Sequence, residues 1–271
     1  MPGLLIDWKM GVTLRYINIR MLLFIILLLI ISLAESKTIH ADVTDDGIND
    51  KIIMGLESVV VVNKFECCKR RRHTLVSDVE CLVDIMVNDF HHGIRGKEIA
   101  VVMLPDSNCV TEIYGFKNNQ FKKISEPLPG KITFDDAGYL FGYYTHMWEG
   151  GAVHVPYPII QEDGFLKPAT IELEIETTIV IEANTAKEIS TNLSKNTLVV
   201  CVATAQEKDV IIFLQDEDGS LITQRKIDSK APLVGKTFAD KDKTITLIID
   251  NLQSTTLKRI YYIIKHYAYK P

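Results

Sequence analysis

Alternation of apolar and polar residues is the dominant pattern along this chain. The clearest case is Ile171–Ala183, which reads IELEIETTIVIEA. A two-residue period, rich in β-branched side chains, is typical of strands with one buried face. Similar strand-like segments, rich in β-branched residues, are Lys51–Asn63, Ile99–Leu104, Thr197–Ala205, Val210–Leu214, Thr244–Asp250 and Arg259–His266. We therefore predict an all-β fold.

One segment, Leu75–Val87, carries apolar residues at helical spacing as well, and it is the only helix that the pattern predicts. The same residues would also suit a strand. Turn-forming pairs such as Asn118-Asn119, Asp163-Gly164 and Asp218-Gly219 separate the other segments. Strands joined by short turns favour antiparallel sheets.

The spacing of these segments changes near Pro168. Residues 37–168 hold long, aromatic and irregular connections, whereas 169–271 hold short strands at the spacing of a β-sandwich. We therefore expect two domains, 37–168 and 169–271, the second of them an antiparallel β-sandwich.

The first 36 residues have the pattern of a secretory signal peptide. Met21–Leu33 is an uncharged run of mainly apolar residues, preceded by Arg15 and Arg20 and followed by the small residues of Ala34-Glu35-Ser36. As a helix the run would span about 20 Å, against about 30 Å of bilayer hydrocarbon. We expect cleavage before Lys37 and a secreted or periplasmic protein. An uncleaved signal, which would anchor the chain to the membrane, is the alternative.

Charge and composition exclude some partners. The net charge of −5 and the 24% of charged residues are ordinary for a globular protein, so no nucleic-acid partner is expected. The basic run Lys69–His73 is interpreted as a solvated loop, and the adjacent histidines His91 and His92 as solvated loop residues.

The five cysteines are Cys67, Cys68, Cys81, Cys109 and Cys201. In an oxidising compartment we expect one or two disulfide bonds among the first four, with a connectivity that the spacing leaves open. Cys201 lies in a strongly apolar strand and is expected to be a buried free thiol.

The nine residues from Asp42 to Asp50 have the composition of a calcium-binding loop. Calcium prefers six to eight oxygen ligands, and oxygens at alternate positions of a tight loop converge when a glycine allows the turn. Gly47 provides that turn. The expected ligands are Asp42, Thr44, Asp46, the carbonyl of Ile48, and Asp50. A polar turn with solvated acids is the alternative. Position 12 is Ile53 rather than glutamate, which excludes an EF-hand.

This loop and the strand after it, Asp42–Gly55, resemble the FG-GAP (VCBS-type) repeats of integrin-like β-propellers. A degraded second copy spans Asp89–Glu98, whose ability to bind metal is left open, and a third is outlined by Phe134–Gly138. The resemblance implies a structural Ca²⁺. Because three units are too few to close a propeller, it also implies a compact, propeller-derived module.

The C-terminal region resembles the GOLD-like (emp24-like) β-sandwiches. The resemblance rests on Val210–Ser220, Thr244–Asn251 and Lys258–Tyr267. It implies a domain that binds proteins or lipids or that supports a neighbouring domain.

Aromatic residues gather between Tyr139 and Tyr157, in what we interpret as a recognition loop. Tyr143, His146, Trp148 and His154 are the candidate partner-binding residues, because such rings supply rigid contact area. The alternative is a loop that folds back on its own sheet. No catalytic motif is found, so we predict a non-catalytic protein that binds a protein or a cell-envelope component. An inhibitor or immunity protein against a cell-wall hydrolase, and a hydrolase with a site built from loops, remain alternatives.

Overall fold

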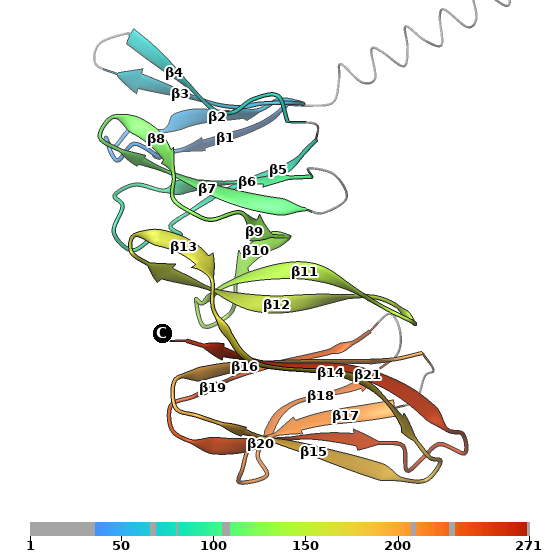
Figure 1. The fold of residues 1–271 in the computed structure, drawn as a ribbon. Helices are drawn as coiled ribbons and strands as arrows, with labels where there is room; N and C mark the ends of the chain where they lie inside the picture. The colour runs from blue at the N-terminus through green and yellow to red at the C-terminus, as the bar shows by residue number, and fades with distance from the viewer. Residues whose placement is uncertain are drawn as a thin grey trace, which may run out of the picture.

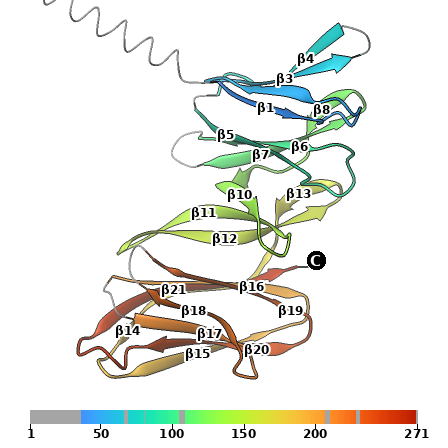
Figure 2. The ribbon, with the colours of Figure 1, turned by 180° about the vertical axis from the view of Figure 1, so that it is seen from behind.

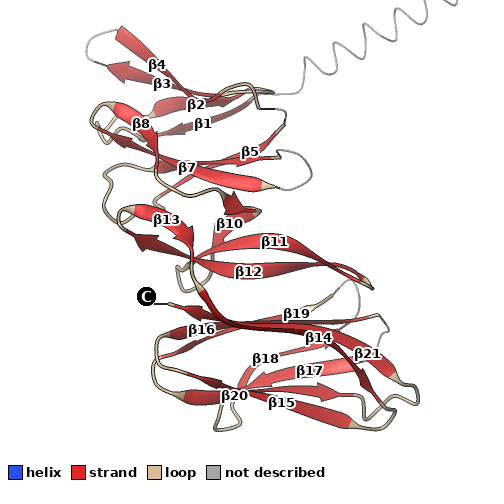
Figure 3. Ribbon diagram, in the orientation of Figure 1, coloured by secondary structure: helices blue, strands red, loops and turns tan. Residues whose placement is uncertain are grey.

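The computed structural model describes residues 36–65, 69–79, 81–104, 109–206, 210–227 and 231–269. Every regular element in these ranges is a β-strand, and all strand pairs that build the sheets are antiparallel (Figure 3). The prediction of an all-β fold is thus confirmed. The signal peptide expected at residues 1–36 lies outside the described ranges except for Ser36, and no described helix is long and apolar enough to cross a membrane.

The N-terminal half consists of three antiparallel meanders, each with its strands paired in chain order. The first meander contains β1 (Lys37–Ala41), β2 (Asp50–Met54), β3 (Val59–Phe65) and β4 (Lys69–Val76). The second contains β5 (Leu82–Asn88), β6 (Glu98–Met103), β7 (Val110–Lys117) and β8 (Gln120–Lys123), with the short β9 (Leu128–Pro129) beside β7. The third contains β10 (Lys131–Phe134), β11 (Leu140–Trp148), β12 (Gly151–Glu162) and β13 (Phe165–Pro168).

The C-terminal half is a sandwich of two four-stranded sheets. The proximal sheet, which faces the third meander, has the order β14 (Ile171–Ile181), β21 (Lys258–Ala268), β16 (Thr197–Ala205) and β19 (Leu233–Ala239). The distal sheet has the order β15 (Ala186–Leu193), β20 (Lys243–Asp250), β17 (Val210–Gln215) and β18 (Leu221–Ile227). The predicted antiparallel sandwich is therefore present.

The five sheets are stacked in a column, from the first meander at one end to the distal sheet at the other (Figures 1 and 2). Three hydrophobic clusters form the core. One fills the space between the first two meanders. Another joins the second and third meanders to the proximal sheet, and the last fills the sandwich. All nine residues of β16 are buried, because its side chains alternate between the last two clusters. The chain passes from the third meander into the sandwich between Pro168 and Ile171.

Several local predictions are wrong. The helix expected at Leu75–Val87 is the end of β4, a turn in which Asp78 has a φ of 59°, and most of β5. The basic run Lys69–His73 belongs to strand β4, not to a loop. The aromatic segment Tyr139–Tyr157 forms the β11–β12 hairpin, not a loop.

Among the described cysteines, Cys81, Cys109 and Cys201 are free thiols, whereas Cys67 and Cys68 lie outside the described residues. Cys201 is fully buried in β16, as predicted, and burial raises the pKa of its thiol to about 12. No disulfide bond is present among the described three.

Candidate binding groove

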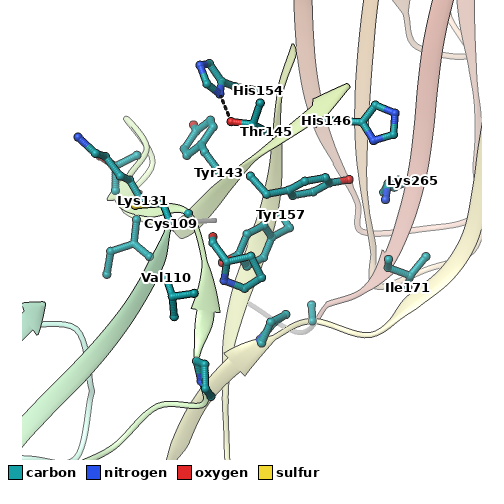
Figure 4. Close-up of a pocket in the computed structure, with 18 of the residues that line it drawn as sticks. Cys109, Val110, Lys131, Tyr143, Thr145, His146, His154, Tyr157, Ile171 and Lys265 are labelled. Carbon is teal, nitrogen blue, oxygen red and sulfur yellow. Dashed lines mark hydrogen bonds between the residues drawn. The ribbon is translucent and has the colours of Figure 1, made fainter. Parts of the chain in front are cut away.

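A groove of about 1400 Å³ lies beside the β11–β12 hairpin, between the third meander and the proximal sheet. Figure 4 shows Tyr143, Thr145 and His154 of the hairpin on one side, and Ile171 and Lys265 on the other, with His146 near Lys265. Tyrosine rings, aliphatic side chains and prolines make up most of its lining, together with a few polar groups. Concave, largely apolar surfaces with a few polar groups are typical of ligand sites.

The hairpin wall is held in place by Tyr157 of β12. Its hydroxyl donates a hydrogen bond to the Pro129 carbonyl oxygen at 2.7 Å. The ring lies across Gly142 of β11, where a Cβ atom would come within 2.1 Å of it, so only glycine allows this position. Nearby, Thr145 and His154 form a cross-strand pair, with 3.3 Å between the hydroxyl oxygen and Nδ1 (Figure 4).

The opposite wall carries two carboxylates of β14, one paired with β21 and the other in contact with the hairpin. The buried Lys265 ammonium lies 2.6 Å from Glu174 and 5.3 Å from the centre of the Tyr144 ring. Burial lowers the pKa of Lys265, but hydrogen bonds with Glu174 and Tyr144 outweigh that effect and leave the pKa above its ordinary value. His146 from the hairpin reaches Glu176, with 3.1 Å between Nε2 and Oε1. Each of the two wall carboxylates thus has a nitrogen partner.

Three of the four predicted partner-binding residues, Tyr143, His146 and His154, line this groove. The fourth, Trp148, stacks on Tyr261 of the proximal sheet, with ring centres 5.4 Å apart and an angle of 15° between the planes. Tyr144, Tyr157 and Lys265 also line the groove and were not among the candidates. Glu174 and Glu176 could have been found, because alternation in β14 places them on one face.

The Asp42–Asp50 loop, the candidate calcium site, joins β1 to β2 and is closed by its own hydrogen bonds. The Asp42 carboxylate accepts from the amides of Asp46 at 3.3 Å and Gly47 at 2.9 Å. The Asp46 carboxylate accepts from the Ile48 amide at 2.8 Å. Gly47 has a φ of 81°, as the expected turn requires. The loop is therefore compact, as predicted. Its backbone N–H groups donate hydrogen bonds to its own aspartate carboxylates.

Asp50 is the buried acid of this loop, 1% exposed. Its Oδ2 accepts from the Val43 amide and the Thr44 hydroxyl, both at 3.1 Å, while Oδ1 has no hydrogen-bond partner. Burial, aided by the charges of Asp46 and Asp42, raises its pKa. The acids are thus near one another, yet within the described ranges no group of three or more histidine, cysteine, aspartate or glutamate side chains is arranged to hold a metal ion.

The second loop, Asp89–Glu98, joins the first two strands of the second meander in the same way. Glu98 begins β6 as Asp50 begins β2, and its Oε2 accepts from the amides of Phe90 at 2.7 Å and His91 at 3.3 Å. Its Oε1 is buried without a partner, and burial raises the pKa to about 7. His91 is buried rather than solvated, with Nε2 3.1 Å from the Gly164 carbonyl oxygen. The acid at the start of the second strand, Asp50 in the first meander and Glu98 in the second, therefore braces the preceding loop.

In the third loop, between β10 and β11, the closing acid is Asp135. Its carboxylate accepts from the amides of Ala137 at 3.1 Å and Tyr139 at 2.9 Å, and it pairs with Lys236 of β19 at 3.1 Å. Hydrogen bonds from Tyr139 and Lys236 outweigh the burial of Asp135 and lower its pKa. A loop closed by the carboxylate of an aspartate or a glutamate therefore recurs between the first two strands of each meander.

No protein-family model matches the chain, and a search of curated proteins also found no match. Among solved structures, a crystal structure of an exo-β-1,3-galactanase from Phanerochaete chrysosporium with galactose is 9% identical. That match covers 86% of this chain and 68% of the other, with a TM-score of 0.33. A structure of infectious bursal disease virus, Gx strain, is 10% identical over 85% of this chain and 76% of the other, with a TM-score of 0.14. Likeness at this level assigns neither a family nor a function to the chain.

Proposed function

We propose that this chain is an exported, non-catalytic binding protein that holds a protein or cell-envelope ligand in the groove beside the β11–β12 hairpin. The observation that carries the proposal is the groove itself, about 1400 Å³ with tyrosine rings in its lining. Rigid aromatic side chains lose little entropy on binding and give large contact areas. Tyr157 is buried and fixed by a hydrogen bond, so this part of the wall is preorganised.

The groove carboxylates Glu174 and Glu176 both have nitrogen partners within the wall. A general acid or base needs a carboxyl or imidazole group that can reach the substrate in the required protonation state. Glu174 contacts Lys265, and Glu176 contacts His146, so both carboxylates are engaged within the wall. We propose that the Lys265–Glu174 pair orients side chains in the wall, and assays of turnover by the pure protein test whether the His146–Glu176 pair exchanges protons with a substrate.

The test is capture of a ligand from cell-envelope extract by immobilised protein and two matched variants. Tyr143→Ala removes a ring that lines the groove, whereas Phe165→Ala removes an exposed ring from β13, on the other edge of the same sheet. We expect Tyr143→Ala to weaken capture about tenfold or more, and Phe165→Ala to leave it unchanged. Equal capture by all three proteins would contradict binding in the groove. Turnover of glycan or ester substrates by the pure protein would support the hydrolase alternative.

A second candidate, an inhibitor of a cell-wall hydrolase, is favoured by the exposed tip of the hairpin. Met147 at this tip is 70% exposed, whereas the neighbouring Trp148 is used in stacking on Tyr261. An inhibitor that plugs an active site would insert Met147 first. Loss of hydrolase inhibition in Met147→Asp, with the melting temperature unchanged, would support this candidate.

We also propose that Ca²⁺ braces the Asp42–Asp50 loop. Support comes from the acidic residues gathered there and from the buried Asp50 Oδ1, which has no partner within the protein. With about 1 mM calcium and a dissociation constant of about 0.1 mM, binding would stabilise the fold by about 1.4 kcal/mol. A chelator should then lower the melting temperature of the wild type and leave that of Asp46→Ala unchanged. Equal wild-type melting curves with and without chelator would contradict the site.

A further inference from the structure

We propose that the groove binds an extended peptide, which pairs as an added strand with the open edge of β11 beyond the end of β10. This inference rests on the proposed function and specifies the ligand class and the way it is bound. Strand addition combines backbone hydrogen bonds, which supply affinity, with pockets for alternate side chains, which supply specificity.

β11 is longer than its neighbour β10. β10 pairs with β11 only from Phe134 opposite Leu140 to Lys131 opposite Tyr143. β11 continues to Trp148, and on its other side it pairs with β12 all the way to Gly151. Within the described part of the chain, residues 144–147 have no strand partner on the β10 side. Among the described residues, no strand pairs with their outward backbone groups, and we propose that an incoming strand does so.

Gly130 explains why β10 ends where it does. Its φ is 73°, and a Cβ atom there would lie 1.7 Å from the Tyr143 carbonyl oxygen, so no other residue fits. Its amide donates to the Cys109 carbonyl oxygen at 2.6 Å, and its own carbonyl oxygen accepts from the Thr111 hydroxyl at 2.6 Å. The backbone of Gly130 is thus committed to β7, and the chain turns away from β11 at this residue.

The groove follows the edge that β10 leaves open. It is lined by Gly130 and Lys131 at the start of β10, and by Tyr144, Thr145 and His146 along β11. Successive side chains of β11 point to opposite faces of the hairpin. The side chains of an added strand would alternate in the same way, with one set toward Tyr144 and His146 and the other toward Thr145.

The two open edges of the hairpin differ in a way that favours this site. Natural proteins protect open edges with proline or lysine, which prevents pairing with other chains. The part of β12 that lies beyond β13 contains Pro156 and Pro158. The open part of β11, Tyr144–Trp148, contains neither proline nor lysine. Only the β11 edge, which faces the groove, is thus left competent for strand addition.

The ion pairs indicate what kind of peptide would fit. Lys265 forms an ion pair with Glu174 in the wall, and the His146 ring contacts a Glu176 carboxylate oxygen. Burying a charged peptide side chain against such pairs would be costly. The expected peptide therefore carries uncharged aromatic or β-branched residues at the positions that enter the groove.

The experiment starts from a displayed peptide library selected on the immobilised full chain. The best peptide is synthesised in three forms. One is unmodified, and the other two carry N-methyl groups on alternate amides, in one register or the other. N-methylation removes backbone donors and keeps the side chains. We expect at least one methylated register to bind about tenfold more weakly or worse. We also expect the unmodified peptide to slow hydrogen exchange of amides within Tyr144–Trp148, with no change at β13.

Three outcomes would overturn the inference. The first is that no selected peptide slows exchange within Tyr144–Trp148. The second is that both methylated registers bind as well as the unmodified peptide. The third is that the same amides are protected without peptide at high protein concentration, which would identify a second copy of this chain as the occupant. The Tyr143→Ala variant separates this inference from the proposed function. If one of the three outcomes is found but Tyr143→Ala still captures less ligand from envelope extract than the wild type, binding in the groove is retained and only strand addition is rejected.

Discussion

At the scale of single residues, the most informative feature is the repeated buried acid. Asp50 and Glu98 each begin the second strand of a meander, accept amides from the start of the preceding loop, and keep one oxygen without a partner. Composition alone indicated acidic loops. It did not indicate which acid is buried, because burial depends on how the meanders stack.

Glu98 makes folding dependent on pH. Its pKa in the folded protein, about 7, is raised above the ordinary 4.5 by burial. The folded state therefore favours the protonated acid, and stability present below pH 4.5 is lost as the pH rises through 7. We expect the free energy of unfolding to fall by about 2 kcal/mol between pH 5 and pH 8 from this group. Urea titrations should show that Glu98→Gln removes this dependence, and that the exposed control Glu188→Gln does not. A wild-type stability that rises across this range would contradict the assignment.

Gly142 allows Tyr157 to form the groove wall. In Gly142→Ala the new methyl group would meet the Tyr157 ring, so ring or backbone must move. We expect a loss of about 1–3 kcal/mol in the free energy of unfolding, together with weaker ligand capture. Gly55→Ala is the control, because its Cβ would meet Ser58 at an ordinary 3.6 Å. Thermal melting of both variants measures the difference, and equal melting temperatures would argue against a tight fit at Gly142.

At the scale of elements, strands with one clear periodicity were predictable and the hairpin was not. Thr197–Ala205 was predicted from its apolar run and is β16 with the same ends. The Tyr139–Tyr157 segment has aromatic residues on both faces, which conceals its two-residue period. The charge of Lys69–His73 suggested a loop, yet β4 is an edge strand, where basic side chains can remain in water. Leu75–Val87 matched helical spacing only because two strands meet at a turn.

Trp148, the fourth predicted partner-binding residue, contributes to the packing of the hairpin. Its stacking on Tyr261 holds the end of β11 against the proximal sheet. We expect Trp148→Ala to lower the free energy of unfolding by about 1–3 kcal/mol, whereas Met147→Ala, at the exposed neighbour, changes it little. Denaturant unfolding of both variants provides the comparison. A Trp148→Ala protein with wild-type stability and no ligand capture would instead place the ring in the binding surface.

At the scale of the whole molecule, the site depends on packing that no local pattern reveals. Tyr144 and Lys265 lie far apart in sequence and meet only because the third meander covers the proximal sheet. The sequence predicted the all-β class, the sandwich and three residues that line the groove. It could not predict the groove itself, which is formed by the contact between two halves of the chain.

The contact between the third meander and the sandwich should contribute to the stability of the sandwich. Leu198, Val200 and Ile263 of the proximal sheet are buried within the cluster shared with the third meander. A piece containing only residues 169–271 would expose them to water. We expect this piece to melt at a lower temperature than the full chain and to bind a hydrophobic dye. A piece that melts like the full chain and binds no dye would show that the sandwich is independent.

The proposed export also concerns the whole chain. We expect the mature protein, recovered from outside the cytoplasm, to begin near Lys37, because the apolar run and the small residues after it fit signal-peptidase cleavage. N-terminal sequencing measures this directly. Leu28→Arg, which places a charge in the apolar run, should keep the protein inside the cell. Secretion of that variant at the wild-type level would contradict the signal.

The claim that the groove holds the ligand is tested most directly by photo-cross-linking. A photoreactive phenylalanine analogue is placed at Tyr143, which lines the groove, or at Phe165, on the other edge of the sheet, and the protein is irradiated with envelope extract. We predict one dominant adduct from position 143 that excess unlabelled wild-type protein competes away, and none from position 165. The same adducts from both positions, or no competable adduct from position 143, would contradict the account.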